Sequence, residues 1–128
     1  LRALKKPVVL ITSNRTREIH DALKRRCLYY WVDYPDFEKE IEIVECRCPQ
    51  ASRELAQQAV GFVQSLRKED LFKRPGVSET FDWINSLVAM NQQQISEAVL
   101  EDTLGALLKY RDDLEMARDG VAARLLKK

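Results

Sequence analysis

Two short apolar runs near the start of the chain predict β-strands. Residues 8–12 (Val-Val-Leu-Ile-Thr) and 28–32 (Leu-Tyr-Tyr-Trp-Val) are rich in β-branched or aromatic side chains. Such runs are typical of strands, and an unbroken apolar run is typical of a strand buried inside a parallel sheet. Between them, residues 19–26 indicate a short helix with Thr16 as a candidate cap. The order strand, helix, strand predicts α/β structure over residues 1–35.

After residue 35 the apolar positions follow the period of amphipathic helices. Asp36 is a candidate cap for a helix that Cys48 and Pro49 end, because the residue before a proline avoids helical geometry. A stronger pattern follows Ser52, with apolar residues three and four apart up to Leu66. The core faces of these two predicted helices are formed by Phe37, Ile41 and Val44 and by Leu55, Ala59, Phe62, Val63 and Leu66.

Two further helical stretches complete the pattern. A loop at 73–76 precedes a helix that Ser78 is expected to cap, with Glu79 and Asp82 in its first turn. A polar joint at 91–94 leads to a helix over 99–126, which Gly120 could break. The expected core residues are Phe81, Ile84, Leu87, Val88, Leu100, Leu104, Leu107, Leu108, Leu114 and Val121. The predicted fold is therefore mainly α: a two-strand α/β segment over 1–35, followed by a helical bundle over 36–128.

Composition and charge exclude some classes of protein and argue against others. The 128 residues are 45% apolar and 32% charged, with only four glycines and four prolines, which excludes a disordered or fibrous chain. No apolar run approaches the roughly 20 residues of a membrane span. The net charge of +1 argues against a dedicated nucleic-acid binder. No leader segment is visible at residues 1–7, and an odd count of three cysteines favours reduced thiols in a cytoplasmic protein.

The sequence carries little support for three other kinds of site: a phosphate-binding loop, a catalytic histidine and a metal site. The sequence contains neither G-x-x-x-x-G-K-[ST] nor G-x-G-x-x-G, so no phosphate-binding loop is expected within it. His20 stands beside Asp21 without a nearby nucleophile, which favours a solvated histidine. Cys46-x-Cys48, even with Cys27, lacks the usual zinc spacing, so buried thiols are expected and no metal site.

Polar and basic residues follow the first predicted strand. Asn14 comes directly after it, where ligands of open α/β sheets bind, and a basic cluster at 24–26 ends the short helix. Taken alone, these residues favour a simpler interpretation, in which the asparagine is solvated in a turn and the cations complement a helix C-terminus.

Three stretches resemble a known family. They are Pro-Val-Val-Leu-Ile-Thr-Ser-Asn-Arg-Thr-Arg-Glu-Ile at 7–19 with Asp-Ala-Leu-Lys-Arg-Arg-Cys at 21–27, Pro-Gly-Val-Ser-Glu-Thr-Phe-Asp-Trp at 75–83, and Thr-Leu-Gly-Ala-Leu-Leu-Lys-Tyr-Arg-Asp at 103–112. Together they are similar to the second half of an AAA+ ATPase module of the MoxR family, in the branch linked to carbon monoxide dehydrogenase maturation. The resemblance spans nearly the whole chain.

The resemblance implies roles for individual residues. Asn14 matches the sensor 1 residue that orients the attacking water, and Arg26 matches the arginine finger that acts on nucleotide bound to a neighbouring subunit. Arg25 is the second candidate for the finger. An always-charged planar guanidinium suits that role, because phosphoryl transfer requires neutralised charge on the phosphate oxygens. The sensor 2 arginine of relatives falls at Thr80 here, so the sensor 2 region is represented by Thr80 and by Lys73 and Arg74 just upstream.

The resemblance also implies the larger assembly. Residues 1–35 would be the end of the α/β core and 36–128 the helical lid, while most ligands of ATP and Mg²⁺ would lie upstream. The intact protein would form a homo-oligomeric ring that remodels a client or matures a metalloenzyme, with a von Willebrand A-domain partner. This chain alone would not hydrolyse ATP, and its two strands, which do not touch in the family's sheet, would be association sites.

The alternative is a non-catalytic helical interaction module. Its contact with nucleic acid would be the basic residues of 15–26, namely Arg15, Arg17, Lys24, Arg25 and Arg26. The acidic residues of 36–45 offset this charge, so nucleic acid is not the expected partner.

Overall fold

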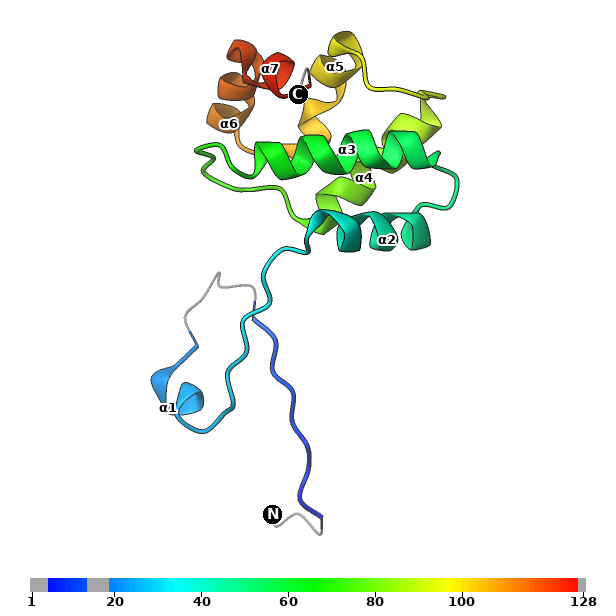
Figure 1. The fold of residues 1–128 in the computed structure, drawn as a ribbon. Coiled ribbons are helices and arrows are strands. Elements are labelled where there is room, and N and C mark those ends of the chain that lie inside the picture. The colour runs from blue at the N-terminus through cyan, green and yellow to red at the C-terminus, as the bar shows by residue number, and fades with distance from the viewer. Residues whose placement is uncertain (1–4, 14–18, 127–128) are drawn as a thin grey trace. The chain divides into compact units, whose positions relative to one another are not determined.

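Helices make up the regular structure of the residues that the structure describes (Figure 1). A computed structural model describes residues 5–13 and 19–126, and the chain divides into two units, Leu1–Asp33 and Tyr34–Lys128. In chain order the elements are α1 (Asp21–Lys24), α2 (Phe37–Arg47), α3 (Arg53–Leu66), α4 (Val77–Ala89), α5 (Glu97–Leu107), α6 (Arg111–Met116), η1 (Ala117–Val121) and α7 (Ala122–Leu126). The prediction of a mainly α fold is confirmed.

The first unit does not form the two predicted strands. Within residues 5–13 and 19–33 the structure contains no strand, and the apolar side chains of both runs are exposed, Val8 at 93% and Leu10 at 92%. A strand is stabilised by pairing with a neighbour, and this stretch of chain supplies no such pairing. The predicted α/β structure over 1–35 is therefore not seen.

The short helix of the first unit is smaller than predicted. It was expected over 19–26 and is confined to α1, with His20 as its cap. The Nδ1 atom of His20 accepts the backbone N–H of Ala22 at 3.3 Å. Thr16, the predicted cap, lies outside the described residues.

In the second unit, two helix starts follow the sequence prediction and one does not. The Asp36 carboxylate accepts the N–H of Lys39 at 2.8 Å to start α2, and Ser52 starts α3 in the same manner. Ser78, the predicted cap of α4, instead lies inside that helix. The cap is Gly76, whose N–H donates to the Glu79 carboxylate at 2.9 Å. A side chain reaching back from the first turn thus replaces the expected hydroxyl cap.

The predicted single helix over 99–126 is divided into α5, α6 and α7. The first break was not predicted: Leu108 is buried and adopts extended geometry (φ −107°, ψ 122°), which ends α5. The second break was predicted. Gly120 has φ of 98°, a left-handed value that favours glycine, and it kinks the chain within η1.

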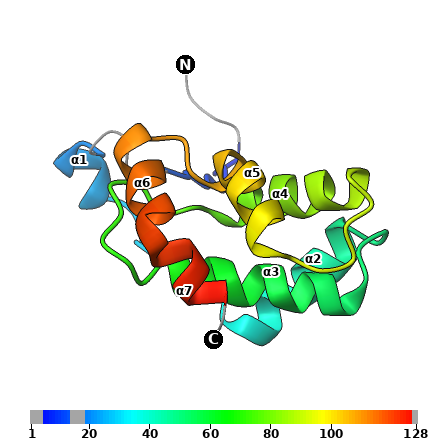
Figure 2. The same cartoon turned by 90° about the horizontal axis from the view of Figure 1, so that it is seen from above.

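The helical unit encloses one hydrophobic core. α3 packs against α2, α4 and α7, and α5 packs against α4 and α7 (Figures 1 and 2). Trp83 is fully buried, with its ring centroid 5.4 Å from that of Phe62 and its indole N–H donating to Thr103 Oγ1 at 2.8 Å. Most predicted core residues are buried, while Phe37, Phe81, Val88, Leu114 and Val121 are half-buried. Among the described helices, none has the length and apolarity needed to cross a membrane.

Candidate functional site

The basic turn that ends α1 carries the two candidate finger arginines. The backbone N–H of Arg25 donates to Asp21 O, and that of Arg26 donates to Leu23 O, both at 3.0 Å, so the turn continues from the helix. Both residues are exposed, and neither guanidinium has a hydrogen bond or ion pair with any described residue. Lys24, beside them, lies 3.6 Å from an Asp21 carboxylate oxygen. Asn14, the sensor 1 candidate, lies outside the described residues.

The sensor 2 candidates occupy two different environments in the second unit. Lys73 and Arg74 are exposed in the loop before α4, and their side chains make no hydrogen bond or ion pair with described residues. Thr80 is fully buried in the first turns of α4. The three residues are near in sequence, but only Lys73 and Arg74 are accessible to a ligand.

Thr80 belongs to a buried ionic network that joins three helices. The Arg67 guanidinium donates to both Glu40 carboxylate oxygens, at 2.7 and 2.8 Å, and its Nε donates to the Pro75 carbonyl at 2.8 Å. The Thr80 hydroxyl lies 3.3 Å from Glu40 and from Arg67, and Gln64 donates to Glu40 at 3.0 Å. Glu40 and Arg67 are 0% and 6% exposed. Such a paired, fully hydrogen-bonded arrangement fixes α2, the end of α3, α4 and the loop before α4 to one another.

The same network fixes the first residues of the helical unit. The Arg67 guanidinium lies 4.4 Å from the ring centroid of Tyr34, and Gln64 donates to the Pro35 carbonyl at 3.4 Å. A guanidinium over an aromatic face is attracted by the ring quadrupole. The segment that leads into α2 is therefore attached to α3 through Arg67 and Gln64.

Glu40 and Arg67 are not among the residues predicted from the sequence, although the sequence carries a signal for them. Glu40 falls four residues before Val44, on the apolar face of α2, and Arg67 falls four residues after Val63, on the apolar face of α3. Opposite charges on the core faces of neighbouring helices indicate a buried pair, because a lone buried charge is strongly unfavourable.

The cysteines and the histidine do not assemble into a site. Among the described residues, no group of three or more Cys, His, Asp or Glu side chains is placed to hold a metal ion. The prediction of buried thiols is confirmed for Cys48 and wrong for Cys27 and Cys46, which are exposed. Burial raises the pKa of the Cys48 thiol, since desolvation disfavours the thiolate.

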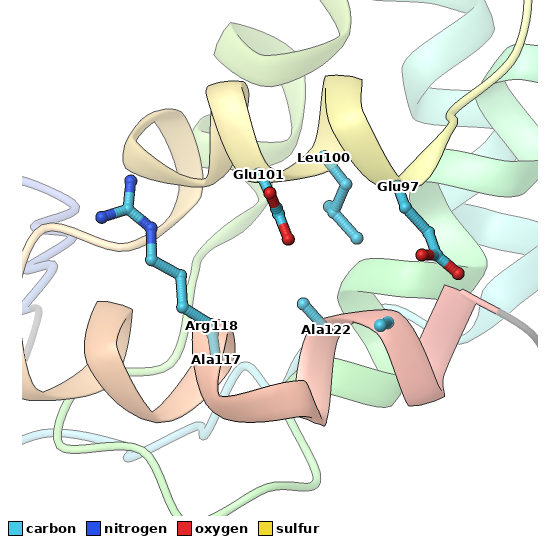
Figure 3. Close-up of a pocket in the computed structure, with 7 residues that line it drawn as sticks. Glu97, Leu100, Glu101, Ala117, Arg118 and Ala122 are labelled. Carbon is cyan, nitrogen blue, oxygen red and sulfur yellow. The ribbon is translucent and has the colours of Figure 1, made fainter.

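A small hollow lies between α5 and the η1–α7 segment (Figure 3). Leu100, Ala117 and Ala122 line it, and Glu97, Glu101 and Arg118 stand at its edge. Its volume of about 20 Å³ has room for a single water molecule. A nucleotide does not fit there.

The chain matches no model of a known protein family, and no curated protein or solved structure was found to be similar to it. The residues themselves therefore define what the site can do. Arg25 and Arg26 offer two permanently charged guanidinium groups, unpaired within residues 5–13 and 19–126, which fit a role toward phosphate or carboxylate groups of another molecule.

Proposed function

We propose that this chain is the C-terminal part of an AAA+ ATPase of MoxR type. In that protein, ATP hydrolysis in a ring of subunits would drive the remodelling of a client protein or the maturation of a metalloenzyme. The motifs at 7–27, 75–83 and 103–112 support this assignment. The helical unit has its own hydrophobic core and follows a short segment whose apolar runs have the composition of strands. This is the organisation expected of a lid that follows an ATPase core.

The observation that carries the proposal is the state of Arg25 and Arg26. An arginine finger acts on nucleotide held by a neighbouring subunit, so its guanidinium must be exposed and free of partners within its own chain. Both arginines meet this requirement among the described residues. Lys24, by contrast, is close to Asp21.

The exposed apolar runs of the first unit also support the proposal. Val8, Leu10, Leu28 and Val32 are among the most exposed apolar side chains of the described residues, yet their runs have the composition of buried strands. Upstream strands of an ATPase core would pair with them and cover them. ATP would be the source of the transferred phosphoryl group. This chain would supply the lid and the arginine whose charge acts on nucleotide bound to a neighbouring subunit.

The test uses the intact ATPase with one arginine changed at a time. Arg26→Ala should lower the rate of ATP hydrolysis by about 10³-fold or more while leaving nucleotide affinity nearly unchanged, because the finger acts on transition-state charge. Lys24→Ala, a change of a neighbouring cation already close to a carboxylate, is the matched control and should leave the rate unchanged. Mixing Arg26→Ala subunits with subunits defective in the phosphate loop should restore part of the hydrolysis.

Two outcomes of that test revise the proposal. If Arg25→Ala gives the large loss and Arg26→Ala does not, the finger is Arg25. If neither change lowers hydrolysis, the ATPase assignment is wrong. A separate observation would also overturn it: a coding sequence upstream of Leu1 that encodes no phosphate loop and no acidic strand end. The 128-residue chain by itself should hydrolyse no ATP.

A non-catalytic interaction module is the second candidate function. It is favoured by the helical unit, whose buried charged side chains are hydrogen-bonded within the unit: Glu40 and Arg67 to each other, and Asp113 to two backbone N–H groups. Such a unit supports binding through its surface rather than chemistry in a cavity. The upstream coding sequence distinguishes the two candidates, since a module of this kind needs no phosphate loop.

A further inference from the structure

An exposed aromatic pair stands on the helical unit where the loop after α3 meets the start of α6. We use this name for Phe72 and Tyr110, which are 79% and 44% exposed. Their ring centroids lie 4.8 Å apart, with the ring planes tilted by 57°. Rings at this separation attract each other, so the two side chains form a single apolar feature.

A buried carboxylate holds the aromatic pair in place. Asp113 is 4% exposed and accepts the backbone N–H of Phe72 at 2.7 Å and that of Lys73 at 3.1 Å, one with each oxygen. Leu71, the preceding residue, is half-buried and packs against the core. Hydrogen bonds to a charged acceptor are among the stronger ones in proteins. Phe72 is thus presented to solvent on a fixed backbone, which reduces the entropy that binding would remove.

Basic residues flank both members of the aromatic pair. They are Lys73 and Arg74 after Phe72, and Lys109 and Arg111 on either side of Tyr110. The side chains of Lys73 and Arg74 have no hydrogen bond or ion pair with described residues, whereas Lys109 and Arg111 are engaged within the unit. Two positively charged side chains beside Phe72, Lys73 and Arg74, are therefore available to an anionic partner.

We infer that the aromatic pair is a docking point for an acidic segment of a partner protein. An apolar side chain of that segment would cover Phe72, and its carboxylates would meet Lys73 and Arg74. Aromatic residues and arginine are the side chains that most often dominate the binding energy of protein interfaces. This inference depends on the helical unit alone and does not require the proposed ATPase activity.

Nucleic acid is the less suitable partner for this surface. Two exposed carboxylates, Asp70 and Asp112, lie in the same two segments, so the surface carries charges of both signs, and a backbone with a phosphate at every nucleotide cannot avoid the negative ones. A protein segment can place its acidic and its neutral groups to match such a mixed surface.

The test measures binding of a fluorescein-labelled peptide, with a central leucine, two glutamates on one side of it and serines on the other, to the full chain by fluorescence anisotropy. Phe72→Ala should weaken binding by about tenfold, as expected for an interface residue that dominates the binding energy. Arg74→Glu should also weaken binding, and added salt should weaken it further. Met90→Ala, a change of an exposed apolar residue at the end of α4, is the matched control and should leave affinity unchanged.

A second peptide and a second ligand separate the alternatives. A peptide with serine in place of the central leucine should bind as weakly to the unaltered chain as the leucine peptide binds to Phe72→Ala. The inference is overturned if the leucine peptide does not bind at millimolar concentration, or if Phe72→Ala leaves its affinity unchanged. It is also overturned if oligothymidine binds more tightly through Phe72, or if sedimentation shows that Phe72 instead mediates self-association.

Discussion

Replacing Arg67 should strongly destabilise the helical unit, because it leaves a buried charge without its partner. Arg67→Met removes two bonds to Glu40, at 2.7 and 2.8 Å, and one to the Pro75 carbonyl at 2.8 Å. The methionine fills part of the space, but the Glu40 carboxylate stays fully buried with only Gln64 and Thr80 as donors. Removing one partner of a buried ion pair destabilises proteins by about 3–5 kcal/mol. This is a large part of the roughly 5–15 kcal/mol by which a typical domain is stable.

The double variant Glu40→Leu/Arg67→Met separates charge from packing. It removes both buried charges, and replacing a buried pair with apolar residues of similar volume is often neutral or stabilising. We therefore expect the double variant to be more stable than Arg67→Met alone. Arg67→Lys should fall between Arg67→Met and the unaltered chain, because an ammonium keeps the charge but cannot reproduce the fork to Glu40 together with the bond to Pro75.

Urea unfolding followed by far-ultraviolet circular dichroism measures these differences. Nearly all described helix lies in Tyr34–Lys128, so the signal reports on the helical unit. A loss below about 1 kcal/mol in Arg67→Met would place the pair among weak surface ion pairs and refute the reasoning. A double variant as unstable as Arg67→Met would show that the loss comes from the packed arginine stem rather than from an uncompensated charge.

The remaining predictions concern two glycines and three thiols. Gly120→Ala should destabilise the helical unit by about 1–2 kcal/mol, because φ of 98° strains an alanine although no atom crowds its Cβ. Gly105→Ala is its matched control: it lies inside α5 with open space at Cβ and should stabilise by about 0.5–1 kcal/mol in the same unfolding assay, and equal signs would contradict both. Iodoacetamide at neutral pH should alkylate Cys27 and Cys46 well before Cys48, whose pKa is raised by burial, and mass spectrometry of the digested protein should show this order. Raising the pH should increase the Cys48 rate as its thiolate forms, and the same rate for all three thiols at neutral pH would show that Cys48 is not buried in solution.

Sequence pattern predicted best those helices whose signals are local. The caps Asp36 and Ser52 and the apolar spacing behind them define α2 and α3 without reference to the rest of the chain. The break at Leu108 carries no comparable signal, because leucine favours a helix and only burial in the folded unit explains its extended geometry. Gly120 was identified because its conformational freedom is a property of the residue itself.

The two predicted strands depend on more than local signals, and the sequence pattern alone did not predict them correctly. Val8 and Leu28 belong to runs with clear strand composition, but a strand exists only when another strand pairs with it. Composition reports a preference for the pleated surface and says nothing of whether a neighbour is present.

The residues of the candidate site also differ in how far the sequence alone predicts them. Arg25 and Arg26 could be singled out because clustered basic residues are visible in sequence, whereas the pairing of Glu40 with Arg67 joins residues that are 27 positions apart. The positions of Glu40 and Arg67 on apolar helix faces indicate burial, but no local pattern indicates that the two residues pair with each other.

The burial of Trp83 makes the helical unit separately visible by fluorescence. The chain has two tryptophans: Trp83 lies in the core with its indole N–H bonded to Thr103, and Trp31 is 54% exposed in the other unit. An indole in an apolar site emits at shorter wavelength than one in water. Trp31→Phe would leave a chain whose emission spectrum reports only on whether the core around α4 is closed. The same chain, joined to any upstream sequence without tryptophan, would reveal the state of the helical unit inside a larger assembly.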